Sequence, residues 1–208
     1  MGERHYAVKG TPTDCVIMAI RHVMRETPPD LVLSGVNLGG NVAEDVSYSG
    51  TIAAAIEGTM LGFPSIALSQ AYGAGGRNAA PWSCAEAHGA RMVRKIIELG
   101  MPKGTLVNVN FPPCEPDEVV GVAAATQGTR DQEFLRVEER RDGRGNPYFW
   151  IAFARTPFEP GHGTDLWAMR ERRISVTPLR LNMTDEPTLT RFPRTTGPRG
   201  SGPSGRTW

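Results

Sequence analysis

The sequence predicts an α/β domain built on a parallel sheet, because helix-like and strand-like segments alternate from Pro12 to Val109. The helix-like segments repeat apolar residues at helical spacing, and the strand-like segments between them are short, apolar and bounded by turn residues. The 24 glycines and 17 prolines stand mostly between these segments, where elements end. Such an alternation is typical of parallel strands, and each crossover from strand through helix to strand is right-handed by default.

The first helix is expected over residues 12–24. The segment Thr11-Pro12-Thr13-Asp14 provides an N-cap, a proline at the first helical position and an acid at the third. Residues 31–33, Leu-Val-Leu, follow a proline-rich break and are typical of a strand buried on both faces. We expect a loop over residues 35–48, after which Ser49-Gly50-Thr51 opens a second helix.

From residue 119 the pattern changes from alternating elements to strands alone. A glycine-rich turn separates two strand-like runs there, which predicts one long hairpin. The remaining expected elements are a strand at 64–68, a helix at 83–99, strands at 105–109 and 119–125, a hairpin of 134–137 and 148–153 around the turn 142–146, and a strand at 173–177.

The composition excludes some classes of partner. With 23 basic and 22 acidic residues, the net charge of +1 provides no field that would hold a nucleic acid. Neither a signal peptide nor a membrane-spanning run is legible, so we expect a protein without membrane contact. The three cysteines are far apart in the sequence and match no metal spacing, which favours reduced, individually buried thiols and a cytoplasmic location.

The turn Ser49-Gly50-Thr51 is the candidate phosphate site. It follows a long glycine-rich loop and opens a helix, so its free backbone N–H groups, its two hydroxyls and the helix dipole favour an anion. Gly50 would let a phosphate approach the backbone closely. The alternative is an ordinary helix N-cap, since serine is common at that position. Neither GxxxxGK[ST] nor GxGxxG is present, which disfavours a P-loop nucleoside triphosphatase and a dinucleotide-binding enzyme.

Asn37 is the candidate metal ligand, because it follows a predicted strand and can offer an amide oxygen to a hard cation. Its alternative role is that of a turn residue. Glu44 and Asp45 are acidic candidates in the same loop. A catalytic triad of Ser49, His162 and Asp165 can be written on paper, but no GxSxG motif exposes a serine. No residue stands out as a general base, so the catalytic residues stay unassigned.

Several motifs in order resemble those of the survival-protein (SurE) family of 5′/3′-nucleotidases. The resemblance covers residues 5–186 and is carried by GTPTDCV (10–16), PPDLVLSGVNLGGN (28–41), SGT with AAIEG (49–58), LVNVNFP (106–112), DGRGNPYFW (142–150), GTD (163–165) and ISVTPLRLNMT (174–184). It implies a Rossmann-like core with helices on both faces of the sheet, and a C-terminal β-hairpin used for oligomer contacts. It also implies hydrolysis of nucleoside monophosphates, with water activated by a divalent metal, Mg²⁺ or Mn²⁺.

The sequence departs from the family pattern at its start. Family members begin with a first βα unit that carries the aspartate pair NDDG, and nothing in this sequence matches it. Of the family's metal-ligand positions only the asparagine carries over, as Asn37. Because Mg²⁺ and Mn²⁺ need carboxylates to offset their dehydration, we expect the chain as given to be a truncated or degenerate member of low activity.

These observations predict a metal-dependent phosphomonoester hydrolase acting on nucleoside 5′- or 3′-monophosphates, assembled as a homodimer or homotetramer. Two rival hypotheses remain: a non-catalytic remnant that binds phosphate or nucleotide or only oligomerises, and a metal-independent serine hydrolase using Ser49. We expect a truncated core at 1–130, a hairpin extension and return strand at 131–186, and a disordered tail rich in Gly, Pro, Ser and Arg at 187–208.

Overall fold

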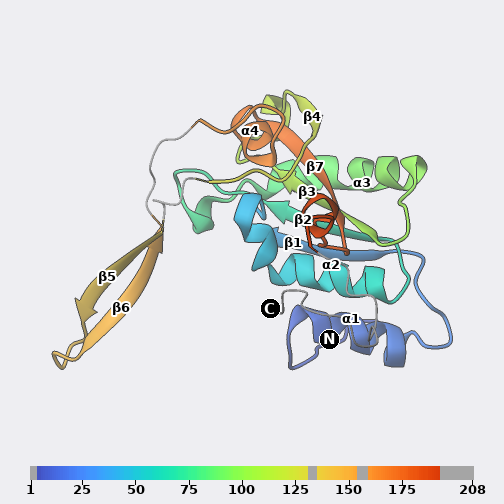
Figure 1. Cartoon of the computed structure of the whole chain (residues 1–208), viewed down its shortest axis with the longest axis horizontal. Coiled ribbons are helices and arrows are strands. Elements are labelled where there is room, and N and C mark those ends of the chain that lie inside the picture. Colours follow the sequence, from blue (N-terminus) through green and yellow to red (C-terminus); the bar gives the residue numbers. More distant parts are fainter. Residues whose placement is uncertain (1–3, 131–134, 154–158, 193–208) are drawn as a thin grey trace, which may run out of the picture.

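The computed structural model describes residues 4–130, 135–153 and 159–192, and Figure 1 shows their arrangement. Within these ranges the central sheet has five strands in the order β1-β2-β3-β7-β4. Its strands are β1 (Val32–Leu38), β2 (Ser65–Gln70), β3 (Thr105–Phe111), β4 (Gly121–Ala124) and β7 (Arg173–Arg180). β1, β2 and β3 are parallel, which confirms the expected parallel arrangement for these strands. β7 pairs antiparallel with β3 and parallel with β4, so the sheet is mixed at that end.

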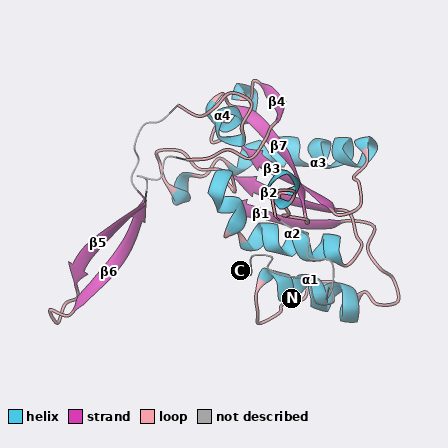
Figure 2. Ribbon diagram, in the orientation of Figure 1, coloured by secondary structure: helices cyan, strands magenta, loops and turns pink. Residues whose placement is uncertain are grey.

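Helices cover both faces of this sheet, as predicted (Figure 2). On one face, Ile52 and Ala55 of α2 (Gly50–Met60) pack against Ala67 and Leu106 of the sheet. On the other face, α3 (Trp82–Leu99) packs against the alternate residues of β2 and β3. Strand residues alternate between faces, so one short apolar strand supplies both cores. The larger core includes Ile66, Leu68, Met92, Ile96, Val107, Val109, Phe111 and Ile174.

The first helical segment spans residues 12–23, close to the expected 12–24, but it is not an α-helix throughout. α1 (Pro12–Met18) starts at the predicted N-cap Thr11, which bonds reciprocally with Asp14 as a capping box, and a π-helical turn at Ala19–Val23 follows it. Its side chains are not buried, apart from Ile20 in the π-helical turn. The local cap at Thr11 therefore predicted where this helix begins.

Two short α-helices were not predicted from the sequence. α4 (Asp165–Arg170) begins at the GTD motif, where Thr164 is the N-cap, and α5 (Glu186–Leu189) is capped by Asp185. Because each helix has only a few residues, neither shows a helical repeat in its sequence. The expected disordered tail from residue 187 therefore begins with part of a helix, and its residues 193–208 lie outside the described residues.

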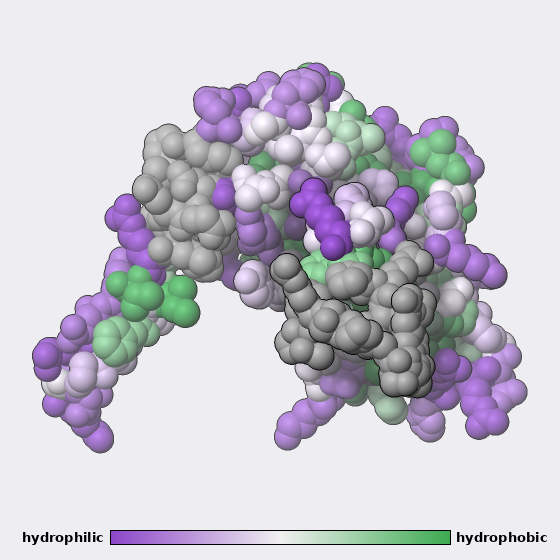
Figure 3. Space-filling model, in the orientation of Figure 1, coloured by the Kyte–Doolittle hydropathy of each residue, from purple (hydrophilic) through white to green (hydrophobic). Residues whose placement is uncertain are grey.

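The predicted hairpin is present and longer than expected. β5 (Leu135–Arg141) pairs antiparallel with β6 (Pro147–Phe153), and the hairpin projects from the main body in Figure 1. Val137, Phe149 and Ile151 lie on one of its faces and are each 66–69% exposed. The apolar patch stands out on the hairpin in Figure 3. An isolated two-stranded ribbon with such a face is marginally stable in water.

The cysteines differ from the expectation of individually buried thiols. Cys15 is exposed on α1, whereas Cys84 and Cys114 are both buried. The latter two contact each other, and Ser83 beside one of them donates to Glu115 beside the other at 2.8 Å. Among the helices in the described ranges, none combines the length and apolarity needed to span a bilayer.

Candidate functional site

The candidate site lies where β1, β2 and β3 end, at the carboxyl edge of the parallel part of the sheet. Open α/β sheets bind their ligands at this edge. A crevice of about 390 Å³ is found there. It is lined by Gly39, Gly40, Val42, Asp45, Ala71, Tyr72, Pro113, Arg130, Met169 and Arg170. The loop from Gly39 to Tyr48 forms one wall and connects the two groups of predicted site residues.

Asn37 lies inside β1 rather than in a loop, because the strand continues past the expected end at residue 33. The pairing with β2 shifts register between Ser34 and Asn37. Gly35 allows this irregularity: its φ is +129°, and a Cβ there would stand 2.3 Å from the carbonyl oxygen of Leu68. The Asn37 side-chain amide donates to the Gly39 carbonyl at 2.8 Å, which orients the amide at this edge of the sheet.

Buried amides from β3 hold Asn41, the first fixed point of the loop. The Asn41 N–H donates to Oδ1 of Asn110 at 2.7 Å, and its carbonyl accepts from the amides of Asn108 and Asn110. Its own side chain donates to the hydroxyl of Ser69 at 2.6 Å. All four side chains are buried, so these bonds are protected from water and keep the loop in one position.

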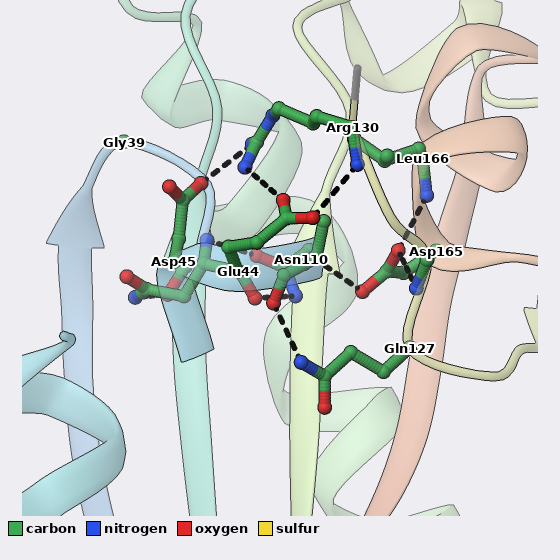
Figure 4. Close-up of polar contacts among 12 residues, drawn as sticks. Gly39, Glu44, Asp45, Asn110, Gln127, Arg130, Asp165 and Leu166 are labelled. Carbon is green, nitrogen blue, oxygen red and sulfur yellow. Dashed lines mark hydrogen bonds and ion pairs between the residues drawn. The ribbon is translucent and has the colours of Figure 1, made fainter. Parts of the chain in front are cut away.

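Asp165 holds the second fixed point, as Figure 4 shows. Its carboxylate is fully buried and accepts three backbone N–H groups: Ala43 at 2.8 Å, Gly128 at 2.9 Å and Leu166 at 2.7 Å. Gln127 adds a bond from its side-chain amide to the Ala43 carbonyl at 2.9 Å. A buried carboxylate is tolerated when several N–H groups solvate it. Asp165 therefore joins the loop, the segment after β4 and the start of α4.

The two acidic candidates of the loop, Glu44 and Asp45, form ion pairs with Arg130. Arg130 contacts Glu44 at 3.4 Å and Asp45 at 2.6 Å, and its backbone N–H also donates to Glu44 at 2.8 Å. The Arg130 side chain is 17% exposed, so the ion pairs are partly shielded from solvent. Glu44 and Asp45 therefore fasten the third point of the loop in this structure.

The described residues do not by themselves fit a divalent metal. They contain no group of three or more His, Cys, Asp or Glu side chains that could hold such an ion. Asn37 offers one neutral oxygen, while Asp165 is surrounded by N–H groups and Glu44 and Asp45 face Arg130. Mg²⁺ and Mn²⁺ bind through carboxylates, which offset the loss of their water.

The predicted phosphate turn caps α2. The Ser49 hydroxyl accepts the N–H of Ile52 at 3.1 Å, so serine does act as the N-cap. In the part of the chain that the structure describes, the backbone N–H groups of Ser49, Gly50 and Thr51 have no hydrogen-bond partner. The missing side chain of Gly50 faces α1: a Cβ there would stand 3.0 Å from Cγ of Pro12. The glycine thus permits helix packing, in addition to any role toward an anion.

The triad that the sequence allowed on paper has no support in these contacts. Both carboxylate oxygens of Asp165 accept hydrogen bonds from backbone N–H groups, and the Ser49 hydroxyl accepts a hydrogen bond from the Ile52 N–H of its own helix. The ring of His162 packs on Trp167, with ring centroids 4.3 Å apart. The sequence reading missed Asn108 and Asn110, although the alternation in Leu-Val-Asn-Val-Asn-Phe places both amides on one face of the strand.

Comparison with known proteins shows which sequences and which fold this chain is similar to. Residues 1–134 match the family described as "Survival protein SurE". The chain is 68% identical over 192 residues to "5'-nucleotidase SurE" of Methylobacterium radiotolerans, a match covering 92% of this chain and 76% of that protein. The same name is given to a protein of Methylocella silvestris that is 61% identical over 192 residues, again covering 92% and 76%.

Among solved structures, the SurE protein of Aquifex aeolicus has the same fold. It superposes with a TM-score of 0.73 at 38% sequence identity, over 88% of this chain and 72% of that one. The matched segment 1–134 contains Asn37, the loop with its fixed points at Asn41 and Ala43, and the turn at Ser49–Thr51. With agreement in sequence over most of its length and in backbone structure, the chain belongs to the SurE family.

Proposed function

We propose that this protein is a phosphomonoester hydrolase that releases phosphate from nucleoside 5′- or 3′-monophosphates. The observation that carries the proposal is the firmly held loop at the carboxyl edge of the sheet, in a chain 68% identical to a protein named 5'-nucleotidase SurE. Phosphoryl transfer depends on positioning and electrostatic stabilisation more than on covalent chemistry by the protein. A loop fixed at Asn41, Ala43 and Glu44 provides such positioning.

In this proposal the turn Ser49-Gly50-Thr51 holds the phosphoryl oxygens. Its three N–H groups lack partners within the described chain, and they lie at the positive end of the 11-residue helix α2. The hydroxyls of Ser49 and Thr51 add two further donors. In a βαβ unit the helix begins at the carboxyl edge of the sheet, so the turn and Asn37 share that edge.

We propose that the cofactor is a divalent ion, Mg²⁺ or Mn²⁺, with the Asn37 amide oxygen as one ligand. The support is the family resemblance and the orientation of the amide by its bond to Gly39. The carboxylates that such an ion needs are not gathered around Asn37 in the described ranges. We therefore derive no catalytic step through the metal from these residues.

We further propose that the extension 131–186 assembles the protein as a homodimer or homotetramer. The apolar hairpin face of Val137, Phe149 and Ile151 is exposed, and a second copy of the chain would bury it. A cytoplasmic location is proposed because Cys15, Cys84 and Cys114 are all free thiols.

The test is phosphate release from 5′-AMP, 3′-AMP and the diester bis(p-nitrophenyl) phosphate, with Mn²⁺, Mg²⁺ or EDTA. It is run on the 208-residue chain and on a chimera with a βα unit carrying the NDDG aspartates ahead of Met1. We expect hydrolysis of the monoesters in the chimera, abolished by EDTA, and little hydrolysis of the diester. A double variant S49A/T51V should raise the KM for AMP, with T59V on the same helix as control. Absence of metal-dependent monoester hydrolysis from both proteins would refute the proposed function.

A further inference from the structure

Tyr72 lines the crevice, and neither the proposed phosphate site nor the proposed metal site gives it a role. Tyr72 lies two residues after the end of β2, and among the residues lining the crevice it is the aromatic one. A Cβ added to Gly39 would stand 3.4 Å from Cε1 of Tyr72 and 3.8 Å from Nδ2 of Asn37. The ring and the candidate metal ligand therefore flank the same glycine.

Gly39 brings the backbone of the loop close to the ring. Its φ is +119°, a backbone conformation that strains any residue with a side chain. Gly40 follows, so two consecutive residues of the loop present only backbone to the crevice. Pro113 and Met169 contribute apolar surface to the same lining. The lining around the ring therefore consists of backbone and apolar side chains, and a flat group would stack on the ring from the crevice side.

The charges of the crevice do not favour an additional phosphate. Arg130 is paired with Glu44 and Asp45, and Arg170 is paired with Glu159 and Glu171. Each cation thus faces two carboxylates, which leaves no surplus of positive charge for a polyphosphate chain. An uncharged aromatic group is a better match for a half-buried tyrosine ring with apolar neighbours.

We propose that this crevice is the nucleobase subsite, in which the base of the substrate stacks on Tyr72. The proposal rests on the proposed function and specifies the part of the substrate away from the phosphate. The volume of about 390 Å³ lies within the range of small-molecule pockets. Stacking on a ring tolerates every base but gains more from a larger one, so Tyr72 should favour purines over pyrimidines.

The test compares binding of 5′-AMP, adenosine and ribose 5-phosphate by calorimetry, for the wild type and the variants Y72A, Y72F, Y48A and Y6A. Loss of a stacked base weakens binding by about 5- to 150-fold. Y72A should therefore weaken AMP and adenosine by at least fivefold and leave ribose 5-phosphate within twofold. Y72F should retain most of the affinity, because the ring rather than the hydroxyl makes the contact. Tyr6 is an exposed tyrosine near the N-terminus, and Y6A serves as the matched control.

The outcomes separate this subsite from the proposed function. AMP affinity unchanged in Y72A, or equal loss of AMP and ribose 5-phosphate, would overturn the subsite whatever the catalytic result. Loss of AMP binding in Y48A but not in Y72A would overturn it as well, since Tyr48 is 87% exposed beside the phosphate turn. Selective loss of the base-bearing ligands in Y72A would support the subsite, even where the monoesterase assay described above gives no turnover.

Discussion

Replacing Asp165 with asparagine should lower the stability of the loop and of the whole domain. The carboxylate accepts Ala43 through one oxygen and both Gly128 and Leu166 through the other. An asparagine can keep its oxygen toward Gly128 and Leu166, but its NH₂ group then faces the N–H of Ala43. One buried donor loses its acceptor, and this costs about 1–3 kcal/mol. Asp165→Ala would leave all three donors without acceptors, a loss of about 3–9 kcal/mol that approaches the total stability of a domain.

The measurement is thermal unfolding of D165N beside the wild type and D185N. For a domain of this size, about 1–3 kcal/mol corresponds to a fall in Tm of roughly 2–12 °C. Asp185 is an exposed helix cap, and asparagine caps as well as aspartate does, so D185N should stay within about 0.5 kcal/mol of the wild type. Hydrogen exchange at the Ala43 N–H should also accelerate in D165N. A D165N protein as stable as D185N, with unchanged exchange at Ala43, would refute this account of the buried carboxylate.

Three further predictions concern other parts of the molecule. In the 208-residue chain, Asn37→Ala should change Mn²⁺ affinity by less than about twofold, but in the chimera with the NDDG unit it should lower turnover by on the order of tenfold; equal turnover of the two wild-type proteins would contradict this. Deleting residues 137–151 should lower the mass measured by light scattering, and an unchanged mass would count against the hairpin as the oligomer contact. Burial and the neighbouring Cys114 raise the pKa of Cys84 to about 12, so this thiol stays protonated at pH 8. A maleimide should therefore label the exposed Cys15 first. Rapid labelling of all three thiols in the native protein would contradict this prediction.

The sequence was a good guide wherever the determinants are local. The capping box at Thr11 and Asp14 and the N-cap at Ser49 predicted where α1 and α2 begin, and the structure contains both caps. The apolar run after α2 predicted a buried strand, β2, and the turn at 142–146 predicted the hairpin. The run before α2 predicted a strand buried on both faces, and that burial was wrong: β1 is an edge strand without a buried residue, and Leu33 is 49% exposed. These signals lie within a few residues of one another, so periodicity and turn chemistry are sufficient to read them.

The lengths of the strands depended on neighbours in space. β1 continues to Leu38 because the glycine at position 35 permits a register shift and pairing with β2 then resumes. β7 enters antiparallel between β3 and β4, an order that the chain sequence does not announce. Strand pairing is a long-range choice, and local patterns specify which segments are strands but not which ones become neighbours.

The sequence by itself determined the alternation of helices and strands, the family, and the positions of Asn37 and the turn Ser49-Gly50-Thr51 as the groups to examine. Only the tertiary structure decided what holds them in place. Asp165 reaches Ala43 across 122 residues of sequence, and the Arg130 backbone reaches Glu44 across 86. The roles of these side chains arise because folding buries them beside donors or charges from distant segments. A buried polar group must find its partners wherever the fold supplies them, and no local pattern records that pairing.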